Sequence, residues 1–170
     1  MYQPNINIES ETQIDVRVIS VSLARELRAS ILRPDLSPAM NVYLGDDALD
    51  TLHLGAFKQE RLVGIASLLH QAPKEFAGSH IDSLWLLRGM ATLPQVRGQG
   101  YGTALIQTAC AYVACEHGLY LWCEARENAL GFYEKLGFDV LGNRFNLPPT
   151  GLHYRMWRPI TPADAAFPPF

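Results

Sequence analysis

Three glycines at alternate positions follow an arginine in the segment LPQVRGQGYGTAL, residues 93–105, between a strongly apolar run and a helix-prone run. Glycine is a poor residue for the start of a helix unless the backbone needs an unusual conformation or a ligand must approach it closely. A strand, a glycine turn and a helix in this order offer unpaired backbone N–H groups at the positive end of the helix dipole. The segment therefore predicts an anion site, best suited to phosphate, within a domain that mixes strands and helices.

The spacing of this turn distinguishes between three designs for binding phosphate. A P-loop needs GxxxxGK[ST], and the turn has no such lysine. A dinucleotide fingerprint needs GxGxxG or GxGxxA, but the third position is Thr103 or Leu105, depending on the first glycine. The pattern that fits is QxxGxG, which starts at Gln95 and includes Arg97. Taken alone, this pattern would also suit a tight strand-to-helix turn that binds nothing.

Alternating patterns along the chain predict one α/β (α+β) domain. Strands are expected at residues 13–20, 51–57, 61–70, 83–92, 119–125, 138–142 and 152–158, and helices at residues 21–33, 103–118 and 128–138. In the first helix, Leu23, Leu27 and Ile31 form the expected apolar stripe. No repeat or linker divides the chain, so the domain is expected to span residues 1–160, followed by a proline-rich tail at residues 161–170.

Composition excludes several classes of protein. Lysine and arginine number 14 against 17 aspartates and glutamates, a net charge of −3 with no basic stripe, so no nucleic-acid partner is expected. No apolar run reaches the roughly 20 residues that cross a bilayer, and the N-terminus lacks the features of a signal peptide. We therefore expect a cytoplasmic protein without a membrane partner, in which Cys110, Cys115 and Cys123 are reduced core residues. The five histidines lack the spacing of metal ligands, so no metal is expected.

The QxxGxG pattern resembles the pyrophosphate-binding motif of the GNAT superfamily, the CoA-dependent N-acetyltransferases. The run LLRGMATLPQVRGQGYGTALI is similar to that superfamily's fourth strand, signature turn and following helix. The run LWCEARENALGFYEKLGF is similar to its fifth strand and next helix, with the ending FYxxxGF, so the resemblance covers residues 83–140. It implies a single domain with a mixed, mostly antiparallel twisted sheet that is splayed at the CoA site and flanked by helices.

The resemblance also implies acetyl-CoA as the cosubstrate and indicates which residues contact it. Backbone N–H groups of residues 97–102 would hold the pyrophosphate, and the pantetheine arm would lie where the fourth and fifth strands splay apart, beyond Met90 and Cys123. An N–H at Met90 or Ala91 would polarise the acetyl carbonyl. Arg126 replaces the asparagine that many members place seven residues before the catalytic tyrosine, and it would contact CoA or the substrate. The cofactor-binding residues expected are Met90, Ala91, Thr92, Gln95, Arg97, Gly98, Gln99, Gly100, Tyr101, Gly102, Arg126 and Tyr133.

Acetyl transfer from a thioester to an amine is expected to proceed by direct attack, since no pattern for a covalent acyl-enzyme is recognisable. The resemblance implies that Tyr133 is the general acid. A phenol with its ordinary pKa of about 10 is protonated at neutral pH and can donate a proton. The same helical spacing would suit a core tyrosine. Glu124 is the expected general base, directly or through water; a salt-bridged glutamate, or a water chain with no single base, would fit as well. Asn128 is expected to cap the helix that carries Tyr133. Weaker candidates for the base are Glu75, His80 and Asp82.

These residues predict an acyltransferase that moves an acetyl group from acetyl-CoA to a primary amine. A small-molecule amine is favoured over a protein N-terminus, and Tyr43 with its surrounding loop is expected to line the acceptor pocket. Two alternatives stay open: a CoA-binding regulatory module without turnover, and an acyltransferase or hydrolase that uses another acyl-CoA. The last strand, residues 152–158, is apolar enough to allow a homodimer. The long loop holds four acidic residues that are interpreted as solvated: Asp35, Asp46, Asp47 and Asp50.

Overall fold

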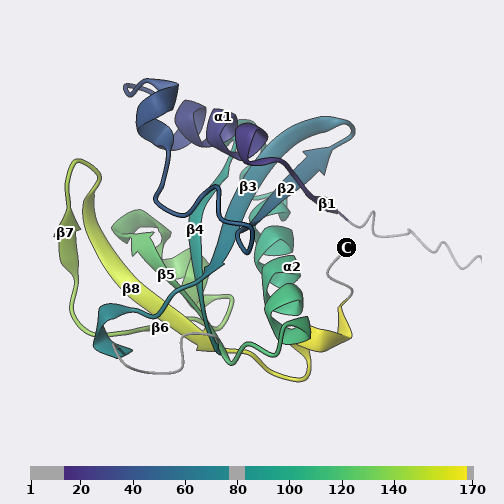
Figure 1. Ribbon diagram of the computed structural model, residues 1–170, viewed down its shortest axis with the longest axis vertical. Coiled ribbons are helices and arrows are strands. Elements are labelled where there is room, and N and C mark those ends of the chain that lie inside the picture. Colours follow the sequence, from purple (N-terminus) through teal and green to yellow (C-terminus); the bar gives the residue numbers. More distant parts are fainter. Residues whose placement is uncertain (1–13, 77–82, 168–170) are drawn as a thin grey trace, which may run out of the picture.

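The computed structural model describes residues 14–76 and 83–167 and arranges them around one open, twisted sheet (Figure 1). The strands follow the order β1-β2-β3-β4-β5-β8-β6, with β7 beside β8. Neighbouring strands run antiparallel except β4 and β5, which are parallel. The strands are β1 (Asp15–Val18), β2 (Leu52–Lys58), β3 (Arg61–His70), β4 (Leu84–Thr92), β5 (Tyr120–Arg126), β6 (Asp139–Val140), β7 (Phe145–Leu147) and β8 (Gly151–Pro159).

The described residues form the helices α1 (Val21–Leu32), α2 (Tyr101–Cys115) and α3 (Leu130–Glu134). The two longer helices cover opposite faces of the sheet. Ala66 of β3 belongs to the core that α2 completes, whereas its neighbour Ile65 packs in a second cluster with Ala24 of α1. Neighbouring residues of a strand point to opposite faces, so α1 and α2 lie on opposite sides of β3.

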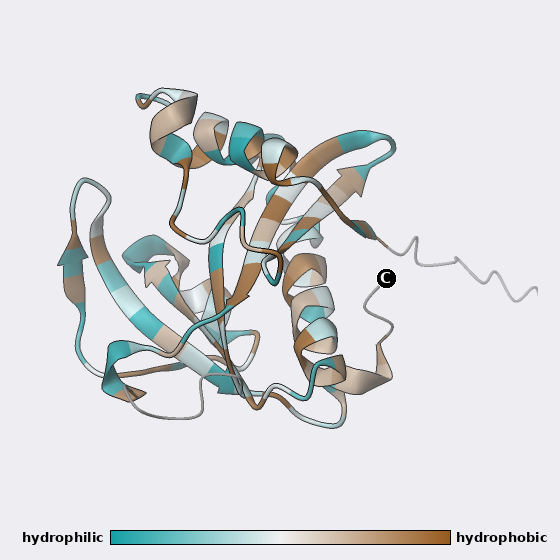
Figure 2. Ribbon diagram, in the orientation of Figure 1, coloured by the Kyte–Doolittle hydropathy of each residue, from teal (hydrophilic) through white to brown (hydrophobic). Residues whose placement is uncertain are grey.

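The main core lies between the sheet and α2. Figure 2 shows apolar residues along β3 and on α2, whereas polar residues gather at the turn of the β2–β3 hairpin. Trp85 of β4 is buried in this core, as are Cys110 and Cys123. Cys115 was also expected in the core, and that prediction is wrong: Cys115 is exposed because it lies at the last residue of α2.

Two predicted elements of the C-terminal half differ from the observed ones. The helix expected at residues 128–138 starts as a 3-10 turn, Glu127–Ala129, and α3 ends at Glu134, shortly before Gly137 takes a φ of 81°. The sequence predicts no strand at Phe145–Leu147, which nevertheless pairs with β8 as β7. A strand this short is specified by its partner across the sheet, and local periodicity does not carry that information.

The C-terminal segment turns back onto the domain. Arg158 Nη2 donates to Asp164 Oδ1 at 2.8 Å, and Asp164 Oδ2 accepts from the backbone N–H of Thr161 at 2.8 Å, so the start of the proline-rich tail is anchored beside α2. Strand β8 pairs with β5 on one side and with β6 and β7 on the other. A second copy could therefore not extend the sheet by pairing with β8 in this arrangement, and the homodimer stays a prediction.

Candidate active site

Strands β4 and β5 separate part-way along their length. They pair only over Leu84–Leu87 and Tyr120–Cys123, although β4 continues to Thr92 and β5 to Arg126. On β5 the separation starts at the predicted residue, Cys123. On β4 it starts at Leu87 and so precedes the predicted residue, Met90. The parallel pair therefore opens into a V, and the last residues of β4 face this opening without a β5 partner in the described part of the sheet.

A bulge in β4 accounts for the early separation. The register between β3 and β4 shifts between Ile65 and Ser67, and Gly89 takes a left-handed backbone with a φ of 58°. A Cβ at Gly89 would lie 2.7 Å from Arg28 Nε, which is closer than real side-chain contacts allow. Both the conformation and the space therefore restrict this position to glycine.

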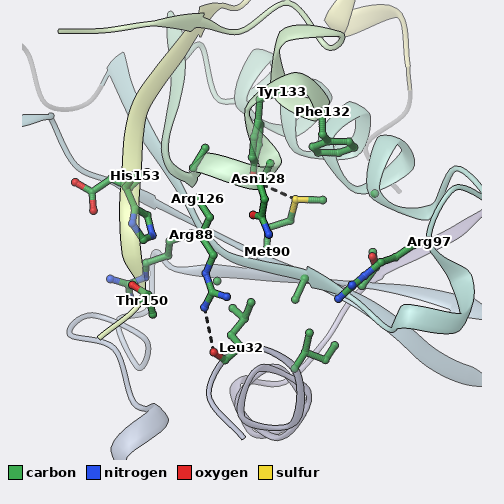
Figure 3. A pocket seen from close by; sticks show the side chains of 18 of the residues that line it. Leu32, Arg88, Met90, Arg97, Arg126, Asn128, Phe132, Tyr133, Thr150 and His153 are labelled. Atoms are coloured by element: carbon green, nitrogen blue, oxygen red, sulfur yellow. Dashed lines mark hydrogen bonds between the residues drawn. The ribbon is translucent and has the colours of Figure 1, made fainter. Parts of the chain in front are cut away.

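A cavity of about 900 Å³ lies between the two strands. The glycine turn lines one end, and Arg88, Thr150 and His153 lie toward the other, with Met90 and Tyr133 between them (Figure 3). The predicted cofactor-binding residues that line it are Met90, Ala91, Thr92, Arg97, Gly98, Gly100, Gly102, Arg126 and Tyr133. Those that do not line it are Gln95, Gln99 and Tyr101.

The glycine turn has the geometry of an anion site. Gly98 and Gly100 have φ values of 76° and 90°, in the left-handed region that favours glycine. Gly100 is the N-cap of α2, and no side chain of the described residues caps this helix, so N–H groups of its first turn are left for a ligand. A Cβ at Gly102 would come within 3.2 Å of Met90 Cε and Phe132 Cζ, so the missing side chain allows close packing beneath the turn.

Tyr133 belongs both to the main core and to the lining of the cavity, and its role as general acid stays a prediction. It packs in the main core with only 7% of its surface exposed, and it also lines the cavity. Its hydroxyl donates to Met90 Sδ at 3.3 Å, and its ring points from α3 toward Met90 (Figure 3). Burial, reinforced by the neighbouring Cys123 thiol, raises the pKa of Tyr133 well above its ordinary value. The phenol therefore keeps its proton at neutral pH and can donate it.

Glu124 reaches the cavity from β5 but carries an ion pair. Its Oε1 lies 3.0 Å from Arg155 Nη2, and Arg155 also pairs with Glu75. Glu124 thus meets both descriptions that the sequence left open, a carboxylate at the splayed strands and a salt-bridged strand-end residue. Among the weaker candidates for the base, Glu75 does not line the cavity, and His80 and Asp82 lie outside the described residues.

Arg126 and Asn128, which follow the part of β5 that pairs with β4, reach the cavity in different ways. Arg126 Nη2 donates to Leu32 O at 3.0 Å, which ties the end of β5 to the end of α1. Asn128 was expected to cap α3, but the N-cap is Ala129, and no side chain among the described residues caps that helix. Because it lies one residue earlier, in a 3-10 turn, Asn128 instead directs its amide into the cavity beside Met90 (Figure 3).

A buried ionic network joins the long loop after α1 to the sheet. Arg28 of α1 is fully buried, and its Nη1 and Nη2 lie 2.6 Å and 3.3 Å from the two carboxylate oxygens of Asp46. Arg88 of β4 donates to Asp46 Oδ1 at 3.1 Å. Ser67 Oγ lies 3.2 Å from Arg28 Nη2 and 2.8 Å from His53 Nδ1. Asp46 was expected to be solvated, and that prediction is wrong, because three arginines draw it into the interior.

The charges of this network follow from its surroundings. Burial alone would raise the pKa of Asp46, but the hydrogen bonds from Arg28 and from the backbone N–H of Tyr43, together with the charges of Arg28 and Arg88, outweigh it and lower that pKa. Burial lowers the pKa of His53, and the backbone carbonyl and charge of Asp46 offset this only in part. Asp46 is therefore ionised and His53 neutral at pH 7.

The far end of the cavity is built from residues that no motif indicates. They come from the end of α1, from β4, from the β7–β8 turn and from β8, so only the tertiary fold brings them together. The residues are Arg33, Arg88, Thr150 and His153. One signal was available: Arg88 is the only charged residue in the apolar run SLWLLRGMAT, and such a residue needs a partner. Tyr43 also lines the cavity, and its place in an acceptor pocket stays a prediction.

Comparisons with known proteins agree with this geometry. Residues 50–140 match the family model of the acetyltransferase (GNAT) domain. YitI, an uncharacterised N-acetyltransferase of Bacillus subtilis (strain 168), is 37% identical over 148 residues, which make up 86% of this chain and 97% of that protein. Ard1 from Thermoplasma volcanium matches with a TM-score of 0.69 and 18% identity, over 88% of this chain and 99% of that one. An aminoglycoside 6'-N-acetyltransferase complexed with coenzyme A matches with a TM-score of 0.65 and 16% identity, over 87% of this chain and 98% of that one.

The chain belongs to the GNAT superfamily, and the fold predicted from its two motifs is confirmed. It is accordingly an N-acetyltransferase of class EC 2.3.1. Within residues 14–76 and 83–167, no three histidine, cysteine or acidic side chains are grouped so that they could hold a metal ion. In the same part of the chain, no helix has the length and apolar character needed to cross a membrane.

Proposed function

We propose that this N-acetyltransferase transfers an acetyl group from acetyl-CoA to the primary amine of a small molecule by direct attack. The observation that carries the proposal is the cavity that joins the glycine turn to the phenol of Tyr133. Acetyl-CoA would supply an acetyl group activated as a thioester. The coenzyme A complex of the similar aminoglycoside 6'-N-acetyltransferase supports this choice of cosubstrate.

The residues along the cavity fit the parts of such a molecule in order. The uncapped first turn of α2 and the guanidinium of Arg97 are the groups proposed to hold the pyrophosphate. The free edge of β4 at Met90, Ala91 and Thr92 offers backbone groups to the amides of the pantetheine arm. The amide of Asn128, which makes no hydrogen bond to another described residue, points into the same stretch of the cavity.

The chemistry requires one proton acceptor and one proton donor. As the amine nitrogen forms a bond to the carbonyl carbon, we propose that its proton passes to Glu124, directly or through water. The carbon–sulfur bond breaks, and the leaving sulfur takes the proton of the Tyr133 hydroxyl. A backbone N–H at Met90 or Ala91 is proposed to stabilise the negative charge that develops on the carbonyl oxygen.

Acetyl-CoA binding is the first test of this proposal. Replacing Gly100 by glutamate is expected to raise the Kd of acetyl-CoA by at least about 100-fold, or about 2.7 kcal/mol. The substitution would put a carboxylate at the N-cap of α2, where the pyrophosphate is proposed to lie, on a backbone with a φ of 90°. Calorimetric titration of the purified proteins with acetyl-CoA measures the change.

Gly137 provides a matched control for this substitution. It also has a left-handed backbone, with a φ of 81°, but it is exposed and lies outside the cavity lining. Gly137→Glu therefore adds the same charge and a similar backbone strain without touching the proposed site. If the wild type and Gly100→Glu bind acetyl-CoA with equal affinity, the pyrophosphate does not bind at the turn. A wild type that binds no acetyl-CoA would refute the proposed function.

The assignment of the base has its own test. Glu124→Gln is expected to lower kcat/KM by about 100-fold, because the amide cannot accept the proton. Initial rates of CoA release measure this effect. Glu75→Gln is the control, since it removes the other carboxylate partner of Arg155 without changing the cavity lining. If Glu124→Gln keeps kcat/KM within about twofold, a water chain is the base.

A further inference from the structure

The part of the cavity beyond the reacting centre carries an excess of positive charge. Among the described residues that line the whole cavity, the arginines and carboxylates are Arg33, Arg88, Arg97, Arg126 and Glu124. Arg97 lies at the glycine turn, whereas Arg88 and Arg126 lie on the other side of Met90 (Figure 3). The cations at this second end are therefore separate from the proposed pyrophosphate site.

The buried network neutralises Arg88 only in part, because Arg88 shares the carboxylate of Asp46 with two other arginines. It contains the guanidinium groups of Arg25, Arg28 and Arg88 and the carboxylates of Asp46 and Asp47. Asp46 forms its two-oxygen pair with Arg28, and Asp47 pairs with Arg25 at 2.5 Å. Three cations against two anions leave one positive charge in excess. Of the three guanidinium groups only that of Arg88 lines the cavity, so the excess charge is presented there.

Two further arginines of the cavity lining, Arg33 and Arg126, have no carboxylate partner among the described residues. Arg33 Cζ lies 5.0 Å from the centroid of the Tyr43 ring, and Arg88 Cζ lies 5.5 Å from the same centroid, so both groups contact one aromatic ring. Arg126 donates only to Leu32 O, a neutral carbonyl. Neither Arg33 nor Arg126 forms an ion pair with any described residue. The structure thus holds guanidinium groups together at a cost that a bound anion would offset.

We propose, on the basis of the acetyl transfer proposed above, that the acceptor is a small amine that also carries a carboxylate, which Arg88 binds together with Arg33 and Arg126. The planar guanidinium fork matches a carboxylate, and one such pair can form two parallel hydrogen bonds. Glu124, the carboxylate of the lining, pairs with Arg155 and does not cancel this charge. A polyamine would place a second ammonium among these arginines, so the site disfavours polycationic acceptors.

Two five-carbon probes test the sign of the charge that this end accepts. Glutarate carries a carboxylate at each end, and cadaverine carries an ammonium at each end of a chain of the same length. Each is titrated by calorimetry into the free protein and into the protein saturated with CoA. Glutarate is expected to bind at least about tenfold more tightly than cadaverine in both forms, because each hydrogen-bonded charge pair contributes on that scale.

Three variants locate the binding. Arg88→Gln is expected to weaken glutarate binding by about tenfold or more, and Arg33→Gln, which breaks no ion pair, is expected to weaken it in the same direction. Arg61→Gln removes one positive charge at the exposed start of β3, outside the cavity lining, and is expected to leave glutarate binding unchanged. Circular dichroism establishes which variants are folded. If Arg88→Gln does not fold, Arg33→Gln decides.

The outcomes separate this inference from the function on which it rests. Tighter binding of cadaverine, no binding of either probe, or unchanged glutarate affinity in the folded arginine variants would each overturn the anionic acceptor. A wild type that binds glutarate but not acetyl-CoA would refute acetyl transfer while leaving an anion site at Arg88. If Arg61→Gln loses glutarate binding as well, the binding depends on the net charge of the protein and not on this site. That result would also overturn the inference.

Discussion

Replacing Asp46 by asparagine is expected to lower the free energy of unfolding by about 3–5 kcal/mol, a large fraction of the stability of a typical domain. Asparagine keeps the size of the side chain but removes its charge. Arg28, which is fully buried, and Arg88 would then share no anion in the interior, because the second carboxylate, Asp47, pairs with Arg25 at the surface. Urea denaturation followed by circular dichroism measures the loss.

The same substitution is expected to change how stability depends on pH. The pKa of Asp46 is lower in the folded protein than in the unfolded chain, so its ionisation stabilises the fold above about pH 4, the unfolded value. This contribution disappears as the pH falls through the lowered pKa of the folded state. The wild type should therefore lose more stability below about pH 4 than Asp46→Asn does.

Asp47→Asn is the matched control, because Asp47 is adjacent, has the same charge and also pairs with an arginine. Its side chain is 68% exposed, so breaking its pair with Arg25 should cost less than about 1 kcal/mol. If the free energy of unfolding of Asp46→Asn lies within about 1 kcal/mol of the wild-type value, the other contacts of the loop after α1 are sufficient to hold it. Arg88 would then not need the ion pair with Asp46.

Local patterns predicted most of the half of the chain that carries the motifs, although α3 is shorter than expected. The glycine turn and the FYxxxGF ending each combine a recognisable spacing with a strand or helix beside it, and the structure places both on the same cavity. At Gly98 and Gly100 the residue type follows directly from the backbone conformation, so the sequence alone predicts the turn.

The acceptor end could not be predicted in the same way. Of the apolar stripe placed at Leu23, Leu27 and Ile31, the last two pack against the core, but Leu23 is 43% exposed. The fully buried residues of α1 are Ala24 and Arg28, and the arginine fits there because Gly89 in the β4 bulge leaves room for its guanidinium. The periodicity of a helix cannot show that Arg28 pairs with Asp46, which lies in a loop 18 residues further along the chain.

Substituting phenylalanine for Tyr133 is expected to lower kcat by about 100- to 10,000-fold while the Kd of acetyl-CoA stays within about twofold. The change removes one hydroxyl, whose partner is Met90 Sδ, and leaves the ring packed against Phe132 and Phe138. Because the pKa of Tyr133 is raised well above its ordinary value, the wild-type rate should not fall from loss of this proton up to about pH 10. Single-turnover rates of acetyl transfer, measured with a saturating amine, isolate the chemical step from product release.

Tyr120→Phe removes the same atom from a tyrosine that stacks on Trp157 outside the cavity lining, and it should leave kcat unchanged. A Tyr133→Phe protein with a kcat within about twofold of the wild type would make Tyr133 a core residue, and the leaving thiolate would then take its proton from water. A wild type that binds acetyl-CoA and releases CoA without any amine would be a hydrolase. If instead it binds acetyl-CoA and turns over neither with water nor with any amine, the same cavity serves a CoA-binding regulatory module.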